Sequence, residues 1–77
     1  MTLKLGIIGP KQMVFLVHNT IKAEYSDVQL IDLIYNDYSE APEIVLKNQA
    51  GTDALLFGGK LPFKAAEALV EKEVPWT

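Results

Sequence analysis

The sequence predicts an α/β fold in which helices cover both faces of a small parallel sheet. Three short apolar stretches, residues 3–8, 28–35 and 54–57, have the length and composition of strands. A longer stretch with helical periodicity follows each of them. These helical stretches are residues 11–25, 40–50 and 61–73. Strands that alternate with helices through short links form right-handed βαβ units with parallel strands, so we expect a three-layer (βα)3 unit.

The first apolar stretch is the strand around which the rest is arranged. Leu3, Leu5 and Ile7 point to one side of it and Ile8 to the other, so the strand is apolar on both faces. This pattern is typical of the centre of a parallel sheet that helices cover on both sides. A Gly-Pro pair ends the strand, and the first helix follows at once.

The second strand carries two polar residues, Gln29 and Asp32, and this favours a position at the edge of the sheet. With the first strand central, the strand order becomes 2-1-3, which begins a flavodoxin-like, doubly wound sheet. The alternative order, 3-2-1, would begin a dinucleotide-binding half. It would also bury Gln29 and Asp32 in a central strand, which costs more free energy.

Several residues predict where the second and third helices begin and end. Ser39 is a good N-cap, and Pro42 lies in the first helical turn, where a missing N–H costs little. Gly51 stands where a left-handed C-cap residue belongs. In the third helix, Glu67 follows Lys64 by three residues, and we expect a small helical ion pair there.

The last four residues, Val74-Pro75-Trp76-Thr77, look like the start of a fourth strand. We therefore expect residues 1–77 to form a single α/β subdomain that is the N-terminal part of a longer chain. The alternative is a natural end at which Trp76 folds back on the core.

Composition excludes several classes of function. The 77 residues are 49% hydrophobic, which is ample for a core, and they include no cysteine for a disulfide or a thiolate metal site. The net charge is −3 and every basic residue is a lysine, so we expect no contact with nucleic acid through this segment. No stretch reads as a signal peptide or is long enough to cross a membrane, and we expect a soluble, cytoplasmic domain.

Ligands of doubly wound sheets bind at the carboxyl ends of the strands, and two of the three ends carry glycines here. The helix N-termini at this rim, together with two lysines, favour a small anionic ligand. We expect Tyr35 to belong to the core. The predicted ligand-binding residues are Gly9, Pro10, Lys11, Gln12, Asn36, Tyr38, Gly58, Gly59 and Lys60.

The residues at this rim do not match the motifs of two better-known kinds of site, the dinucleotide-binding site and the phospho-receiver site. A dinucleotide fingerprint aligned on Gly9 places Lys11 and Val14 where glycines are required. A phospho-receiver would need acidic residues after the first and third strands. His18, the single histidine, falls in mid-helix without an evident acid or nucleophile, and Asp32 and Glu43 have no evident partner. We therefore predict no catalytic residue, no metal site and no cofactor.

In layout, the chain resembles the first lobe of periplasmic-binding-protein-like sensor domains of bacterial transcriptional regulators, such as the propionate-catabolism activator type. The resemblance rests on Leu3–Pro10, on Thr52–Gly59 with its aspartate-led strand and Gly-Gly turn, and on a helix followed by Val74-Pro75. It implies a small-molecule sensor with a second lobe, and no ligand-reading residue can be transferred.

Three hypotheses for function follow. The first is a non-catalytic sensing part of a cytoplasmic regulator, with a small-molecule effector at the strand ends. The second is the nucleotide-binding N-terminal piece of an oxidoreductase. The third is a protein-interaction module that forms a dimer or another homo-oligomer through its sheet edge or Trp76.

Overall fold

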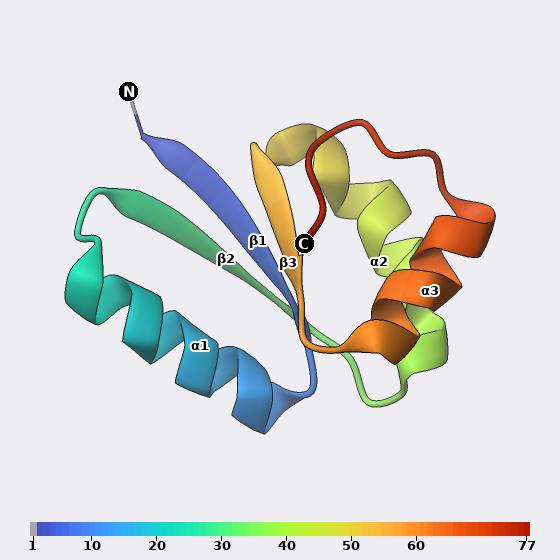
Figure 1. Cartoon of the computed structure of the whole chain (residues 1–77), viewed down its shortest axis with the longest axis horizontal. Helices are drawn as coiled ribbons and strands as arrows, with labels where there is room; N and C mark the ends of the chain where they lie inside the picture. The colour runs from blue at the N-terminus through green and yellow to red at the C-terminus, as the bar shows by residue number, and fades with distance from the viewer. Residues whose placement is uncertain (1) are drawn as a thin grey trace.

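A computed structural model describes residues 2–77 and shows a three-stranded parallel sheet in the order β2-β1-β3 (Figure 1). The predicted α/β class and strand order are thus confirmed. The strands are β1 (Leu3–Gly9), β2 (Val28–Ile34) and β3 (Ala54–Phe57). The helices are α1 (Lys11–Glu24), η1 (Tyr38–Glu40), α2 (Ala41–Asn48), η2 (Gln49–Gly51) and α3 (Lys60–Leu69), where η denotes a short 3₁₀ helix.

The register of the sheet explains which side chains face which helix layer. Ile7 of β1 lies opposite Asp32 of β2 and Leu56 of β3, whereas Ile8 lies opposite Leu33 and Phe57. The Ile8 side of the sheet packs against α2 and α3 and forms the main core. Buried members of that core are Ile8, Tyr35, Ala41, Val45, Leu55, Phe57 and Ala66.

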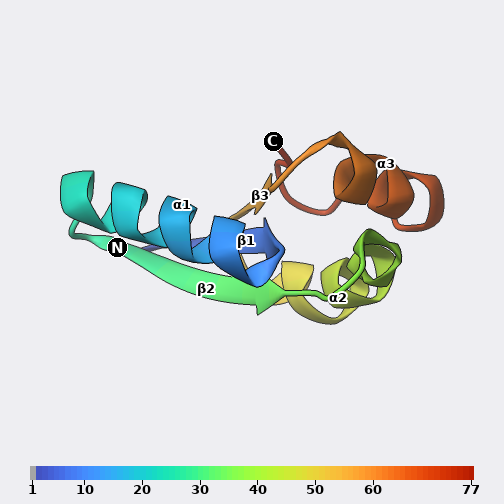
Figure 2. The same cartoon turned by 90° about the horizontal axis from the view of Figure 1, so that it is seen from below.

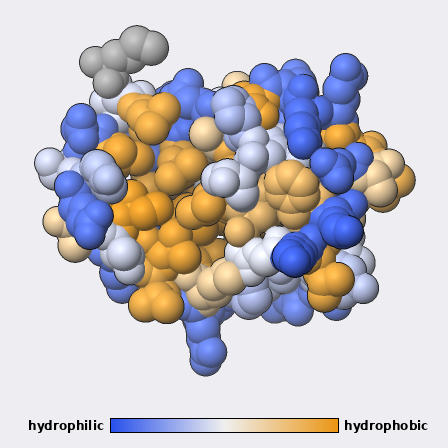
Figure 3. Space-filling model, viewed as in Figure 1, coloured by the Kyte–Doolittle hydropathy of each residue, from blue (hydrophilic) through white to orange (hydrophobic). Residues whose placement is uncertain are grey.

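The opposite side of the sheet carries α1, which lies apart from α2 and α3 (Figures 1 and 2). Val14 of α1 and Ile7 are fully buried there. Coverage of this side is incomplete, because Leu3 is 49% and Leu16 is 68% exposed. Figure 3 shows a broad apolar area on this face of the molecule.

α1 and β2 are joined by a hydrogen-bonded pair of side chains that the sequence analysis missed. His18 Nδ1 lies 2.8 Å from Asp32 Oδ1, and both side chains are about a quarter exposed. Asp32 therefore has a partner, contrary to the prediction. Glu43 also has one, because Lys47 lies 2.8 Å away on the next turn of α2. The edge position of β2 allows Asp32 to meet His18 near solvent.

The predicted helix ends of the α2 region need two corrections. Asp37, rather than Ser39, caps the first turn: its carboxylate accepts the Ser39 N–H, and Glu40 Oε2 accepts the Asp37 N–H at 2.7 Å. Gly51 is not left-handed, since Gly59 is the sole residue with positive φ among residues 2–77. The chain tightens into η2 there and does not need a left-handed residue to leave α2.

The third helix is shorter than predicted. It ends at Leu69, and Val70 is extended at φ −126° and ψ 136°. Lys72 consequently reaches Glu67 at 3.2 Å from outside the helix, and the expected Lys64–Glu67 pair is not among the ion pairs of residues 2–77. The buried Gln49 side chain is one reason for the early end, because it binds residues 71 and 73 and holds them off the helical path.

The last residues lie where a fourth strand belongs, as the sequence predicts. Trp76 forms a parallel bridge with Leu55 of β3, supported by hydrogen bonds from Leu55 N to Pro75 O and from Thr77 N to Leu55 O. Trp76 also packs on Phe57 and Phe63, with ring centroids 5.3 and 5.9 Å away. Trp76 therefore lies beside β3, where a fourth strand would lie, and also packs on the core.

Among residues 2–77, no helix combines the length and the apolar character that crossing a membrane requires.

Candidate functional site

The carboxyl ends of all three strands meet at one edge of the sheet. Gly58 N donates to Ile8 O at 2.7 Å, and Tyr35 N donates to Gly9 O at 3.1 Å, so the segments after β2 and β3 are each bonded to β1. These bonds hold the loops that follow the strands in one rim. The rim therefore has the geometry that the 2-1-3 order implies.

A hollow of about 360 Å³ opens in this rim between the loop after β2 and the start of α3, and we call it the loop hollow. Most of the predicted ligand-binding residues line it. Its lining residues are Pro10, Tyr35, Asn36, Asp37, Tyr38, Gly58, Gly59, Lys60, Leu61 and Pro62. Tyr35 closes the hollow from the core side and is only 8% exposed, as predicted.

Three predicted site residues, Gly9, Lys11 and Gln12, do not line the loop hollow. Gly9 is buried. Lys11 turns back along its own helix, where its ammonium lies 5.8 Å from the centroid of the Phe15 ring. The ammonium group of Lys11, which was predicted to lie at the rim, thus points elsewhere. Lys60 is the predicted lysine that does line the loop hollow.

The glycines of the rim are explained largely by packing. A Cβ on Gly58 would lie 2.1 Å from Met13 Sδ, and a Cβ on Gly9 would lie 3.3 Å from the same sulfur. Gly59 differs, since its φ of 149° is one that side chains other than glycine rarely adopt. Gly9 and Gly58 therefore leave room for Met13, Gly59 starts α3, and these glycines do not by themselves indicate a ligand.

The loop after β2 adds negative charge that the predicted site did not include. Glu40 Oε2 accepts the backbone N–H of Asn36 and of Asp37 at 2.9 and 2.7 Å. The hydroxyl and the backbone N–H of Ser39 hydrogen-bond to Asp37 and lower its pKa. Burial, with Asp37 as a lesser cause, raises the pKa of Tyr35. One wall of the loop hollow is therefore acidic, while Lys60 stands on the other.

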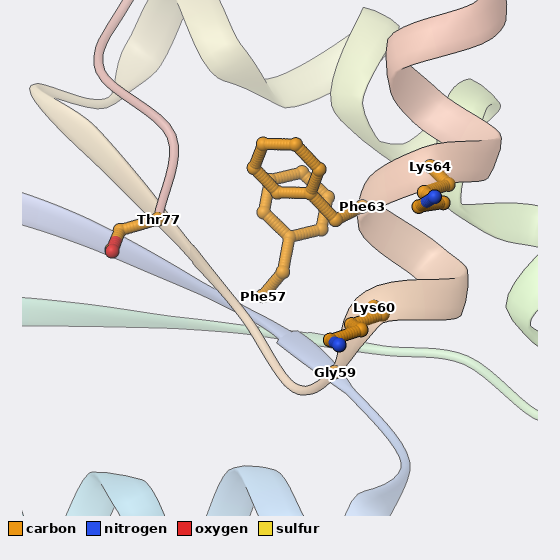
Figure 4. A pocket seen from close by; sticks show the side chains of 6 residues that line it. All are labelled: Phe57, Gly59, Lys60, Phe63, Lys64 and Thr77. Atoms are coloured by element: carbon orange, nitrogen blue, oxygen red, sulfur yellow. The ribbon is translucent and has the colours of Figure 1, made fainter.

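A second hollow, of about 450 Å³, lies on the other side of the Gly59–Lys60 segment, and we call it the aromatic hollow (Figure 4). Sequence reasoning did not find it. Its lining residues are Phe57, Gly59, Lys60, Phe63, Lys64 and Thr77. The i, i+4 spacing of Lys60 and Lys64 at a helix start was the available signal, but the position of Thr77 depends on the chain returning to β3.

Comparison of the chain with protein-family models, with curated proteins and with solved structures found no match.

Proposed function

We propose that this chain is the non-catalytic, small-molecule-sensing part of a cytoplasmic transcriptional regulator. The effector would bind at the carboxyl ends of the strands, in the loop hollow. The observation that carries the proposal is the convergence of the loops after β2 and β3 on one hollow of about 360 Å³. Ligand sites of open α/β sheets lie at such strand ends.

The charges of the loop hollow define how an effector would be oriented. Its anionic group would face Lys60 and the start of α3. Gly59 is the N-cap residue there and has no side chain that could cap the helix. The same group would avoid Asp37 on the opposite wall. Tyr38 and Leu61, which are 43% and 60% exposed, offer apolar surface at the mouth of the hollow.

The chemical groups in the lining of the loop hollow support a sensing role. The hollow contains a carboxylate, a lysine, an asparagine amide and two phenols, and its one acidic side chain is already engaged in capping η1. Such a set suits reversible binding, and a closing second lobe, as in the resembling sensor domains, would complete the enclosure.

Amide NMR spectra of the chain, recorded with pools of small metabolic carboxylates and phosphates, test this proposal. A true effector would shift the signals of Asn36, Tyr38 and Lys60 saturably. Asn36→Ala should weaken that binding, whereas Asn19→Ala, on the exposed face of α1, should not. Saturable shifts confined to other parts of the chain, or none with any pool, would count against the proposal.

Self-association is the second candidate, because the outer edge of β2 has no neighbouring strand among residues 2–77. Trp76 contributes less to this candidate than the sequence suggested, since its ring packs on Phe57 and its indole N–H is bonded to Gln49. Sedimentation at two concentrations tests it, and a strict monomer would remove it.

A further inference from the structure

We propose that the aromatic hollow is a separate binding site for a small organic anion with an apolar, preferably aromatic, body. The site is distinct from the loop hollow, with which it shares only Gly59 and Lys60. The proposal does not depend on the sensing function, because Phe57, Phe63 and Lys64 line the aromatic hollow and not the loop hollow.

The floor of the aromatic hollow is apolar and held in place. Phe57 and Phe63 meet edge to face, with centroids 5.2 Å apart, and Trp76 packs behind both rings. Phe57 is 8% exposed and the other two rings are partly buried. Because the three rings restrain one another, an apolar ligand body would meet a preformed surface.

The charged side chains that line the aromatic hollow are two lysines. Lys60 and Lys64 lie one helical turn apart at its rim, and no Asp or Glu side chain among residues 2–77 lines it (Figure 4). Neither lysine takes part in an ion pair among residues 2–77, in which Lys47 and Lys72 are the lysines that do. Two unneutralised ammonium groups beside aromatic rings favour an anion over a cation or a neutral molecule.

The third lysine near these rings provides a contrast within the same structure. Lys72 lies 5.1 Å from the Phe63 centroid and 5.5 Å from that of Trp76, but Glu67 neutralises it at 3.2 Å. The charge of Lys72 on one side of the three rings is thus neutralised. On the other side, Lys60 and Lys64 have no ion-pair partner among residues 2–77, and the hollow leaves open space beside them. This asymmetry places the ligand on the Lys60–Lys64 side.

Three probes separate the roles of charge and apolar body: phenylacetate has both, phenylacetamide has only the body, and acetate has only the charge. Trp76 is the only tryptophan, so its fluorescence reports on the rings behind the hollow. We expect a saturable fluorescence change with phenylacetate at millimolar concentration, and amide NMR shifts at Phe63, Lys64 and Thr77. The two other probes should bind more weakly.

Lysine variants test the site itself. Lys64→Gln should weaken phenylacetate binding roughly two- to fivefold, the effect of losing one exposed charge contact. Lys22→Gln removes the same charge from α1 and should leave binding unchanged, and Phe63→Leu should weaken phenylacetate and phenylacetamide alike. Unfolding curves for each variant show whether it still folds.

The proposal would be overturned by equal binding of phenylacetamide, by equal losses in Lys22→Gln and Lys64→Gln, or by the absence of saturable binding. Shifts at Asn36 and Tyr38 without shifts at Lys64 would assign the anion to the loop hollow. That result would reject the aromatic site and leave the sensing proposal standing.

Discussion

Gln49 Oε1 accepts a hydrogen bond from Trp76 Nε1 at 3.2 Å, and this bond joins the end of α2 to the last segment of the chain. The same amide oxygen accepts the Glu73 N–H at 3.1 Å, while Nε2 donates to Glu71 O at 2.8 Å. Gln49 is fully buried, so one side chain determines the course of the chain after α3.

Replacing Gln49 by methionine should strongly destabilise the fold. Methionine has a similar shape but would leave the Glu71 carbonyl, the Glu73 N–H and the Trp76 indole N–H without their partner. We expect a loss of roughly 2 to 4 kcal/mol in the free energy of unfolding, measured by urea denaturation. Gln29→Met, at an exposed position of β2, is the matched control and should change stability little.

The same variant should also release the C-terminal segment. Trp76 emission should shift to longer wavelength in Gln49→Met at denaturant concentrations that leave the fold intact, since the indole loses its bond and its packing. Emission identical to that of the wild type would show that pairing with β3 is sufficient to hold the segment.

Gly58 and Met13 should be energetically coupled. Gly58→Ala places a methyl group 2.1 Å from Met13 Sδ and 3.1 Å from Ile8 O, so it should cost roughly 1 to 3 kcal/mol. In a Met13→Ala background the sulfur is absent and the added cost of Gly58→Ala should fall. A double-mutant cycle measures the coupling, and strictly additive effects would contradict this packing account.

Gly59 should resist substitution for a different reason. Its Cβ would meet nothing nearer than Pro62 Cδ at 4.0 Å, but its φ of 149° is unfavourable for alanine. Gly59→Ala should therefore cost roughly 1 to 3 kcal/mol through backbone strain alone. Gly51→Ala is the control, because Gly51 has open space and no positive φ; thermal unfolding should show it to be neutral or slightly stabilising.

Asp37 should make folding stability depend on pH in the acidic range. Its pKa in the folded chain lies below the ordinary 3.8, first because of the Ser39 hydroxyl and then the Ser39 N–H. The ionised carboxylate therefore stabilises the fold above the unfolded-state pKa, and this stabilisation disappears as pH falls through the folded-state pKa. Asp37→Asn should be less stable than the wild type at neutral pH, with the difference shrinking below pH 3.8.

Carboxyl NMR titration checks the cause of the Asp37 shift directly. In Ser39→Ala the hydroxyl donor is gone and the backbone N–H remains, so the pKa of Asp37 should move part of the way back towards its ordinary value. An unchanged Asp37 titration in this variant would assign the shift to another group.

The sequence by itself determined the sheet. A strand apolar on both faces had to lie between helix layers, and Gln29 and Asp32 favoured the edge for β2, because hydrophobic burial and the cost of burying polar groups act on each strand separately. The end of β3 and the place of Pro42 in a first helical turn followed from equally local signals.

Only the tertiary structure decided the features that depend on partners distant in sequence. Gln49 carried no signal in the sequence, because its hydrogen-bond partners lie in residues 71–76, and Gly58 was predicted to bind a ligand, whereas its packing against Met13 accounts for the glycine. Lys11 and Lys60 looked equivalent in sequence, yet their side chains point to different surroundings. Hydrogen bonds and packing between distant residues have no periodic sequence pattern, so the aromatic hollow and the acidic wall of the loop hollow emerged only once the chain was folded.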